Sequence, residues 1–491
     1  MQEIITNFVL VAGAILAALA ATLGLAGAVH LTSRRSQGYM HWIFYAMVLM
    51  FALTSLFSGR DLSGGSGMGM STGRHPLLAL AQPLVSLFLL TVAGERIIAY
   101  WIRSDKTASA PLVLLLIFIF FWSCTVAAPA LLGAHPYLSH DYVYPLIIGI
   151  AAVLTTGRER DLAFTAARNS LMLFMVVGLL LIPFKPNLVL ETGYNQGLLP
   201  GVPRLVGLAA HAVSLAILAQ LGMLCLLVCP YRRVWLNRIA WTIGLSVLFL
   251  AQSKTSWISF ALCLICIVAV RHGPTFWRRF GDPVRPEFGI LSLFVFFFTV
   301  FAMVLIVMFG DLDGRWSSFF NSSEGAQLAS LTGRDKIWVI AYEEWQRNPV
   351  FGYGPTIWDE SFRTTIGMPN ATHAHNQFMD TLSRSGSVGA VALVVYALVL
   401  LVLSVRYART SRGLTLALFM ALAMRSMSEV PLSLFGYSAE LLTHVLLLMA
   451  IAASAGEVRI RNVSITSSQK RPISSRHRPA RDSLVNAGVS S

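Results

Sequence analysis

The stretch FGILSLFVFFFTVFAMVLIVMF, residues 288–309, contains no charged side chain over a length that can cross a lipid bilayer. A helix of about 20 apolar residues is enough to span the hydrocarbon core. A polar island follows at residues 310–386, and a second uncharged run, 387–405, comes directly after it. The sequence therefore predicts a large loop on one side of a membrane, between two spanning helices.

The composition of the whole chain is that of a polytopic membrane protein. Of its 491 residues, 56% are hydrophobic and only 12% are charged, about half the charged share of an ordinary soluble protein. About 13 apolar runs approach spanning length. They cover residues 8–30, 41–57, 76–94, 111–133, 142–156, 169–184, 205–229, 234–252, 256–270, 288–309, 387–405, 413–427 and 439–455. We expect an all-α integral membrane protein with about 12–13 transmembrane helices.

The distribution of basic residues predicts the orientation. The net charge is +14, but most Lys and Arg lie in short clusters between apolar runs and in the C-terminal tail. This is the positive-inside pattern of membrane proteins, so we expect no nucleic-acid partner. With these clusters in the cytoplasm of a bacterium, residues 58–75, 134–141, 185–204 and 310–386 lie outside. The pattern predicts a multi-pass protein whose large loop faces outward, which in a Gram-negative cell means the inner membrane with the site on the periplasmic face.

Four regions follow from this pattern. Residues 1–309 would hold transmembrane helices 1–10, and residues 310–386 a large periplasmic catalytic loop of short helices. Residues 387–455 would hold the C-terminal transmembrane helices. The basic tail 456–491, rich in Ser and Arg and poor in apolar residues, is expected to be disordered in the cytoplasm and to interact with membrane lipids at most weakly.

The front of the polar island predicts a helix start. In Thr332-Gly333-Arg334-Asp335, the Thr332 hydroxyl can cap the backbone N–H of Asp335 while the Asp335 carboxylate reaches back. Arg334 then lies in the first helical turn. A guanidinium beside free N–H groups, at the positive end of a helix dipole, is well placed to hold a phosphate.

The back of the island contains His373-Ala374-His375-Asn376-Gln377-Phe378. His375 would share one helical face with apolar residues three, four and seven positions later. We therefore expect an imidazole on a helix at the rim of a membrane span.

These two ends resemble a known family. His375-Asn376 is followed by nine residues and then by Gly-x-x-Gly at Gly386 and Gly389, which enter a spanning helix after a loop that contains Thr-Gly-Arg-x-x-x-Trp. This arrangement resembles the bacterial O-antigen ligase and O-antigen or exopolysaccharide polymerase superfamily. The segment 348–355, Asn-Pro-Val-Phe-Gly-Tyr-Gly-Pro, also resembles the turn after the first helix of that family's loop. The resemblance is close over residues 331–390 and covers the remaining chain only by its pattern of spans.

The resemblance implies a glycosyltransferase that moves a glycan from undecaprenyl diphosphate to the hydroxyl of an acceptor sugar. His375 would take the acceptor proton, because an ordinary histidine has a pKa of about 6.5 and is largely neutral near pH 7. Arg334, Arg204 and Lys254 would hold the diphosphate and stabilise its charge as the bond breaks. The resemblance implies no cofactor and no metal, and it implies polysaccharide export and chain-length-control proteins as partners.

Two of these cations come from other segments. Arg204 precedes the seventh apolar run, with His211 shortly after it, and Lys254 lies between the eighth and ninth runs. Basic residues are unusual on the outer side, which makes these positions informative. The alternative for each is a cation that pairs with lipid headgroups. Members of the family often carry arginine at both places, and lysine at 254 would bind phosphate as a point charge.

Other polar residues have simpler interpretations. Arg425 and Glu429 are four residues apart at the outer end of a span, and an ion pair on one helix face is favoured over a catalytic role. His373 and His375 could contribute to a metal site, but the adjacent sequence offers no third ligand. Asp311 and Asp313 resemble a metal-nucleotide motif on the side where nucleotide sugars are absent, so a solvated loop is favoured there.

Three functions remain open. The segment Gln252-Ser253-Lys254-Thr255-Ser256-Trp257 is more similar to exopolysaccharide-type polymerases, so a polymerase of lipid-linked repeat units is favoured. The alternative is an O-antigen ligase that transfers finished polymer to lipid A core. A transporter or flippase of lipid-linked glycan is less favoured, because the notable cations lie at the outer ends of spans rather than at their midpoints.

Overall fold

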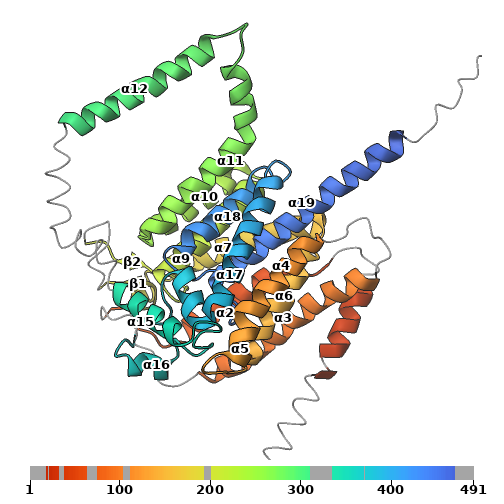
Figure 1. Ribbon diagram of the computed structural model, residues 1–491, viewed down its shortest axis with the longest axis vertical. Coiled ribbons are helices and arrows are strands. Elements are labelled where there is room, and N and C mark those ends of the chain that lie inside the picture. Colours follow the sequence, from red (N-terminus) through yellow and green to blue (C-terminus); the bar gives the residue numbers. More distant parts are fainter. Residues whose placement is uncertain are drawn as a thin grey trace, which may run out of the picture.

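A computed structural model describes residues 18–19, 21–31, 38–63, 75–102, 111–192, 201–309, 334–369 and 371–469 (Figure 1). Within these ranges the chain is almost entirely helical. The two strands β1 (Leu190–Glu191) and β2 (Arg204–Leu205) form a short antiparallel pair, in which Glu191 lies opposite Arg204. The predicted all-α fold is confirmed.

Among the described residues, six helical segments are long and apolar enough to cross a membrane, and seven shorter apolar helices accompany them. Five of the long segments are single helices: α3 (Pro76–Ile102), α7 (Gly157–Leu180), α11 (Lys254–Phe280), α17 (Gln377–Arg406) and α19 (Ala439–Gln469). The sixth, Leu112–Leu132, consists of α4 (Leu112–Trp122), the π-helical turn Ser123–Ala127 and α5 (Ala128–Leu132). The shorter ones are Ala21–Leu31, α2 (Trp42–Leu56), α6 (Val143–Val153), α9 (Ala212–Val228), α10 (Val234–Leu250) and α18 (Leu414–Ser426). The seventh is Glu287–Phe301, the part of α12 (Glu287–Phe309) whose side chains are described. Each overlaps one predicted apolar run, which confirms a polytopic membrane protein.

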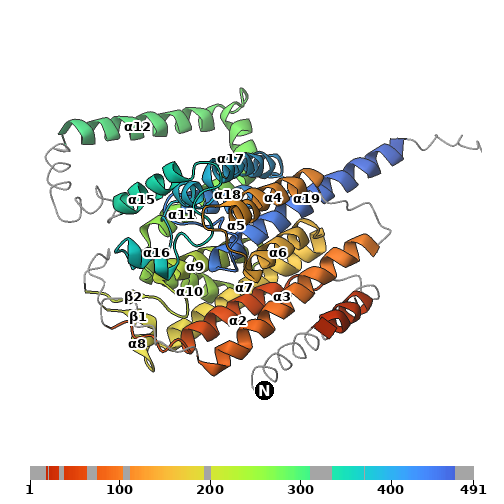
Figure 2. The ribbon, with the colours of Figure 1, turned by 60° about the horizontal axis from the view of Figure 1, so that its bottom comes forward.

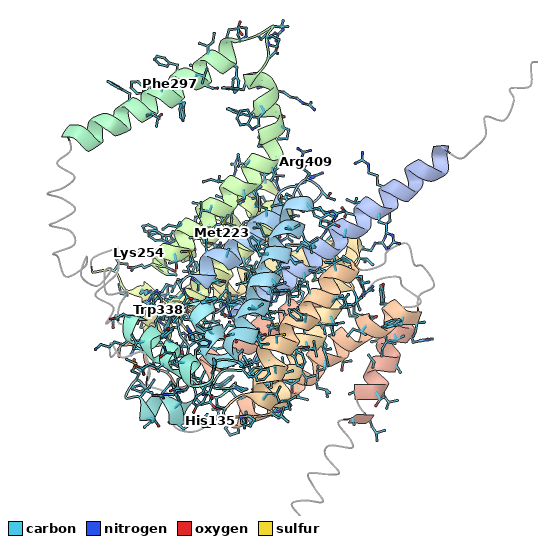
Figure 3. All side chains as sticks on the ribbon, viewed as in Figure 1. His135, Met223, Lys254, Phe297, Trp338 and Arg409 are labelled. Carbon is cyan, nitrogen blue, oxygen red and sulfur yellow. The ribbon has the colours of Figure 1, made fainter. Side chains whose placement is uncertain are left out.

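The centre of the bundle is formed by helices that are apolar on nearly every side. Most side chains of α9 and of the first half of α19 are buried, as expected for helices surrounded by other helices rather than by lipid. Helix α7 packs on α9 and α2, and α11 packs on α18. Helix α12 extends from the end of α11 and lies apart from the bundle in both ribbon views (Figures 1 and 2). Its Phe297 is exposed and points away from the bundle (Figure 3).

Helix α17 contains a kink that joins two of the sequence motifs. Gly386 has φ +64° and ψ −163°, a conformation outside the helical region that glycine tolerates best. The segment 348–354 runs along this kink, and the carbonyl groups of Pro349 and Val350 accept hydrogen bonds from the N–H groups of Ser387 (2.8 Å) and Val388 (3.2 Å). A Cβ atom on Gly386 would lie 2.3 Å from the carbonyl oxygen of Val350. The glycine at 386 is therefore needed for the loop segment to reach the helix.

The helical boundaries correct one expectation. Helix α15 (Arg334–Arg347) contains Arg334, the first described residue after the gap, and the proposed cap Thr332 lies outside the described residues, so the predicted helix start stays a prediction. Helix α19 continues to Gln469, past residue 455, where the last apolar run ends. Helix α17 begins at Gln377, so His375 precedes the helix instead of lying on its first turn.

The polar connections gather at one end of the bundle. Helices α15 and α16 (Glu360–Thr365), the β1–β2 pair and α8 (Pro186–Val189) lie together there (Figures 1 and 2). Lys254 and Trp338 lie toward this end, whereas Arg409 lies at the opposite end (Figure 3). The candidate residues from distant parts of the sequence thus face a common region.

Candidate active site

The histidine loop, residues 371–376, is shaped by the start of α17. The Asn376 side chain accepts hydrogen bonds from the N–H groups of Phe378 (3.0 Å) and Met379 (3.1 Å), which caps the helix. His375 has φ +49°, a left-handed conformation that is uncommon for a residue other than glycine. The expected helical position of His375 is therefore wrong, because Asn376 caps the N-terminus of α17 and His375 precedes this cap.

Two side chains hold the middle of the histidine loop. The Trp338 indole Nε1 donates to the carbonyl of Ala374 (2.9 Å), and the N–H of Ala374 donates to Asp380 Oδ1 (3.1 Å). Asp380 also forms an ion pair with Arg384, four residues later, with Nε to Oδ2 at 3.2 Å. Arg334 lies four residues before Trp338, and residues four apart share a helix face, so Arg334 lies on the side of α15 that faces the loop. The spacing of Arg-x-x-x-Trp thus has a structural reason.

Glu429 lies between the two histidines. Its Oε2 atom is 3.3 Å from His373 Nε2 and 3.4 Å from His375 Nδ1. Helix α18 ends at Ser426, so Glu429 lies beyond the helix and its carboxylate faces the histidine loop. The expected pair of Arg425 and Glu429 on one helix face is therefore wrong.

The carboxyl group of Glu429 is held in its ionised form. Burial alone would raise its pKa, but the polar contact with His375 and the charges of His373, His375 and Arg425 lower the pKa to about 2. Burial and the charge of His375 lower the pKa of His373, while Glu429 opposes this shift. The arrangement favours an ionised Glu429 carboxylate beside the two imidazole rings.

A hydrogen bond assigns the ring proton of His373 only. His373 Nδ1 accepts a hydrogen bond from the backbone N–H of His375 (3.1 Å), so the proton of a neutral His373 ring is at Nε2, facing Glu429. His375 Nδ1 lies 3.4 Å from the same carboxylate without the geometry of a hydrogen bond, and a neutral ring with its proton on this side has the lone pair of Nε2 available. The His375 side chain is 27% exposed, so a substrate can reach it. The loop therefore presents one oriented base.

His373, His375 and Glu429 are also close enough together to be considered as metal ligands, since one ligand atom of each lies within 4.8 Å of the others. A histidine that binds metal usually donates its other ring N–H to an acceptor. The other nitrogen of His373 accepts a hydrogen bond from a backbone N–H instead, which disfavours a metal at Nε2. Glu429 nevertheless supplies the third ligand type that the sequence next to the histidines does not offer.

The candidate phosphate-binding cations differ in their surroundings. Arg334 is partly exposed at the start of α15, and Lys254 is exposed as the first residue of α11. Arg204 is 5% exposed, donates to the carbonyl of Ala251 (2.9 Å) and lies 3.8 Å from Glu191 across the β1–β2 pair. Arg204 thus also connects the strand pair to the end of α10.

His211 caps α9, because its Nδ1 accepts a hydrogen bond from the N–H of Val213 (3.2 Å). It lies within electrostatic range of Arg204, His375, Arg425 and Glu429. The structure thus brings residues from three distant segments to one region, which sequence spacing alone does not show.

A residue that the sequence did not single out helps to hold this region. Arg60 donates hydrogen bonds to the carbonyl groups of Leu188, Gly207 and Ala209, which lie on either side of the strand pair. Its loop is rich in Gly and Ser and has no local motif. Only the fold brings Arg60 to the segment that carries Arg204 and His211.

A polar cavity opens beside the histidine loop, with a volume of about 290 Å³. His373 and Glu429 form one wall, and Phe435 and Tyr437 contribute aromatic surface. Glu440 and the Asp380–Arg384 pair complete its polar lining. Aromatic faces with surrounding hydrogen-bonding groups suit a sugar.

The fold and site define a multi-pass membrane protein with a carboxylate-oriented histidine and several cations at one end of its helical bundle. Residues 239–394 match the family described as O-antigen ligase, a range that includes α11, α15, α16, the histidine loop and the kink of α17. This match confirms the resemblance to the O-antigen ligase and polymerase superfamily, whose members act in polysaccharide biosynthesis. No curated protein matches the chain.

Proposed function

We propose that the protein is a glycosyltransferase of cell-surface polysaccharide biosynthesis that polymerises repeat units carried on undecaprenyl diphosphate. The observation that carries this proposal is the position of Glu429 between His373 and His375, which leaves one histidine nitrogen oriented and free. The family match over residues 239–394 supports the lipid-linked glycan as substrate.

His375 acts as the general base. An acceptor hydroxyl attacks the anomeric carbon of the donor, and its proton moves to Nε2 of His375. The bond between the anomeric carbon and the diphosphate oxygen breaks, and the lipid diphosphate leaves with the bonding electrons. Glu429 keeps the ring oriented and stabilises the imidazolium that forms, because its carboxylate is ionised and 3.4 Å from Nδ1.

The leaving diphosphate gains negative charge as the bond breaks. Arg334 at the start of α15 and Lys254 at the start of α11 offer positive charge together with the ends of helix dipoles. Arg204 contributes a further positive charge and holds the strand pair in place. Stabilisation that grows toward the transition state increases the rate rather than only the affinity.

The polar cavity of about 290 Å³ receives the acceptor sugar. His373 and Glu429 line it, and His375 lies directly behind both of them, so the acceptor hydroxyl has to reach past this wall to the base. Its acidic groups Glu429 and Glu440 would repel a diphosphate, which favours binding of the donor phosphates on the opposite, cationic side.

The reaction takes place at the periplasmic face of the bacterial inner membrane. The positive-inside pattern supports this orientation, since the basic connections around Arg409 lie at the end of the bundle opposite to Trp338 (Figure 3). Polysaccharide export and chain-length-control proteins are the partners that a polymerase at this face would serve. Cationic side chains take the place of a divalent ion, and the proton on His373 Nε2 supports metal-independent transfer.

Deletion of the gene tests the choice between polymerase and ligase. Without a polymerase, cells should accumulate single repeat units on the lipid carrier or on a terminal acceptor, and no long chains should form. Analysis of carrier-linked glycans by mass spectrometry and of surface polysaccharide by gel electrophoresis measures this.

Long chains that remain on undecaprenyl diphosphate, together with bare lipid A core, would contradict the polymerase and indicate a ligase. Complementation with the intact gene is the control. Either result leaves the proposed roles of His375 and Arg334 to be tested separately.

A further inference from the structure

Arg425 is a buried cation without adequate partners among the described residues. Its side chain is 2% exposed, and its Nε and Nη2 atoms have no hydrogen-bond acceptor in the part of the chain that the structure describes. Nη1 reaches the hydroxyl groups of Thr255 and Ser256, each at 3.5 Å. A buried charge with unused donors is unfavourable unless a further group binds there.

The atoms that Arg425 faces belong to the first turn of α11. This helix has 27 residues, and its N-cap Ser253 makes no side-chain capping hydrogen bond. The Ser253 hydroxyl instead pairs with the hydroxyl of Ser256 (2.9 Å). The first turn also lacks an acidic residue, so its free N–H groups and positive dipole end are not compensated by the helix itself.

A guanidinium directed at the positive end of a helix is the wrong charge for that position. Lys254, the first residue of α11, adds a second positive charge, and the charge of Arg334 also acts on Arg425. Glu429 and Glu440 act on Arg425 with the opposite sign, but the carboxylate of Glu429 contacts the two histidines. The positive charges of Arg425, Lys254 and Arg334 therefore favour the binding of an anion here.

We propose that Arg425 and the uncapped N-terminus of α11 form a binding subsite for one phosphate group of the lipid-linked diphosphate. The Nε and Nη2 atoms provide the parallel pair of N–H donors that binds two phosphate oxygens at once. The hydroxyls of Thr255 and Ser256 and the N–H groups of the same turn bind the remaining oxygens. The identity of the ligand rests on the proposed function. Arg425 lies outside residues 239–394, the range that matches the family.

The surroundings determine from which side the phosphate approaches. Arg425 borders a cavity of only about 10 Å³, lined by Glu440 and mainly by apolar residues, which has room for at most about one water molecule. The phosphate therefore has to approach from the start of α11, where Lys254 is exposed. Glu429, whose charge interacts with that of Arg425, then lies between this subsite and the sugar cavity, so the anomeric carbon comes close to His375.

Binding of undecaprenyl diphosphate to the purified full-length protein tests the subsite without requiring turnover. We expect Arg425→Gln to weaken this binding by about ten- to a hundredfold, the effect of losing hydrogen bonds between charged groups. Arg425→Lys should recover little, because an ammonium lacks the fork. Arg409→Gln, at the opposite end of the bundle, is the matched control (Figure 3).

The melting temperature of the ligand-free protein separates this role from a structural one. Because Arg425 has no full set of partners, Arg425→Gln should leave the melting temperature unchanged or raise it, and it should remove the increase caused by undecaprenyl diphosphate. Wild-type affinity in Arg425→Gln would overturn the proposal, and so would a lower melting temperature with unchanged affinity.

The source of the phosphate is tested in the same assay. Inorganic diphosphate should compete with undecaprenyl diphosphate in the wild type and not in Arg425→Gln. Equal competition by nanodiscs that contain phosphatidylglycerol would identify a general lipid-headgroup site and overturn the assignment to the donor. Loss of binding in Arg425→Gln without any transferase activity in the wild type would support the subsite while contradicting the proposed function.

Discussion

At the scale of single residues, the histidine loop is determined by contacts from distant segments. Trp338 binds the carbonyl of Ala374, Asp380 binds its N–H, and Glu429 contacts the histidines on either side. Each contact restricts the conformation of the loop, in which His375 has a left-handed backbone conformation. Uncommon backbone conformations of this kind persist when the surroundings hold them in place.

Glu429→Gln should lower the rate of glycan transfer by about ten- to a hundredfold, because the imidazolium formed during the reaction loses its carboxylate partner. Without this carboxylate, the protonated imidazole is less stable, so the acidic limb of the pH–rate profile should move to lower pH.

The same carboxylate affects stability. The pKa of Glu429 is lowered to about 2, below its ordinary value, so its ionised form stabilises the fold above about pH 4.5 and this stabilisation is lost as the pH falls toward 2. Rates and melting temperatures over this pH range measure both effects.

Glu343→Gln, an exposed position on α15, is the matched control and should behave like the wild type. An unchanged transfer rate and pH profile in Glu429→Gln would contradict the orienting role of this carboxylate.

At the scale of elements, the kink of α17 and the segment 348–354 depend on each other. Val350, Tyr353 and Gly354 form backbone hydrogen bonds with residues on both sides of Gly386. Gly352, at φ +73°, has the same constraint, since a Cβ atom there would lie 2.5 Å from the backbone of Arg384. The two motifs are therefore one structural unit that supports the histidine loop.

Gly386→Ala should destabilise the protein by about 2 kcal/mol or more, because alanine is strained at φ +64° and its methyl group would overlap the carbonyl of Val350. Thermal unfolding in detergent measures the loss. Gly456→Ala, in a helical part of α19 with no atom near the added methyl group, is the control. Equal melting temperatures for Gly386→Ala and the wild type would show that the kink tolerates a side chain.

The sequence predicts the helices better than it predicts the site. Apolar runs depend on local composition, so each corresponds to a helix in the part of the chain that the structure describes. The pairing of Glu429 with the histidines depends on how distant segments pack, and spacing along the chain wrongly suggested Arg425 as its partner. The capping capacity of Asn376 is a local signal that predicts the position of His375 before the helix.

At the scale of the whole molecule, charges are separated around Glu429. Arg334, Arg425 and Lys254 lie toward α11 and α15, whereas the sugar cavity carries Glu429 and Glu440. A low-dielectric surrounding strengthens such a field, so a donor with two phosphates and an acceptor without charge are directed to different sides.

Because positive side chains supply this field, transfer should continue in the presence of EDTA. An assay with purified protein and chelated buffer measures it, with a metal-dependent glycosyltransferase as the control for complete chelation. Loss of activity that magnesium or manganese restores would contradict the account and favour a metal at His373, His375 and Glu429 or at Asp311 and Asp313.

The central claim is that His375 is the base that activates the acceptor. The most direct test is the transfer rate of purified His375→Ala with undecaprenyl-diphosphate-linked repeat units, compared with wild type and with His140→Ala, whose side chain is 80% exposed. We predict that His375→Ala loses transfer by at least about a hundredfold. It should keep its melting temperature and its affinity for the donor, and His140→Ala should retain full activity. Full transfer activity in a correctly folded His375→Ala protein would contradict the claim.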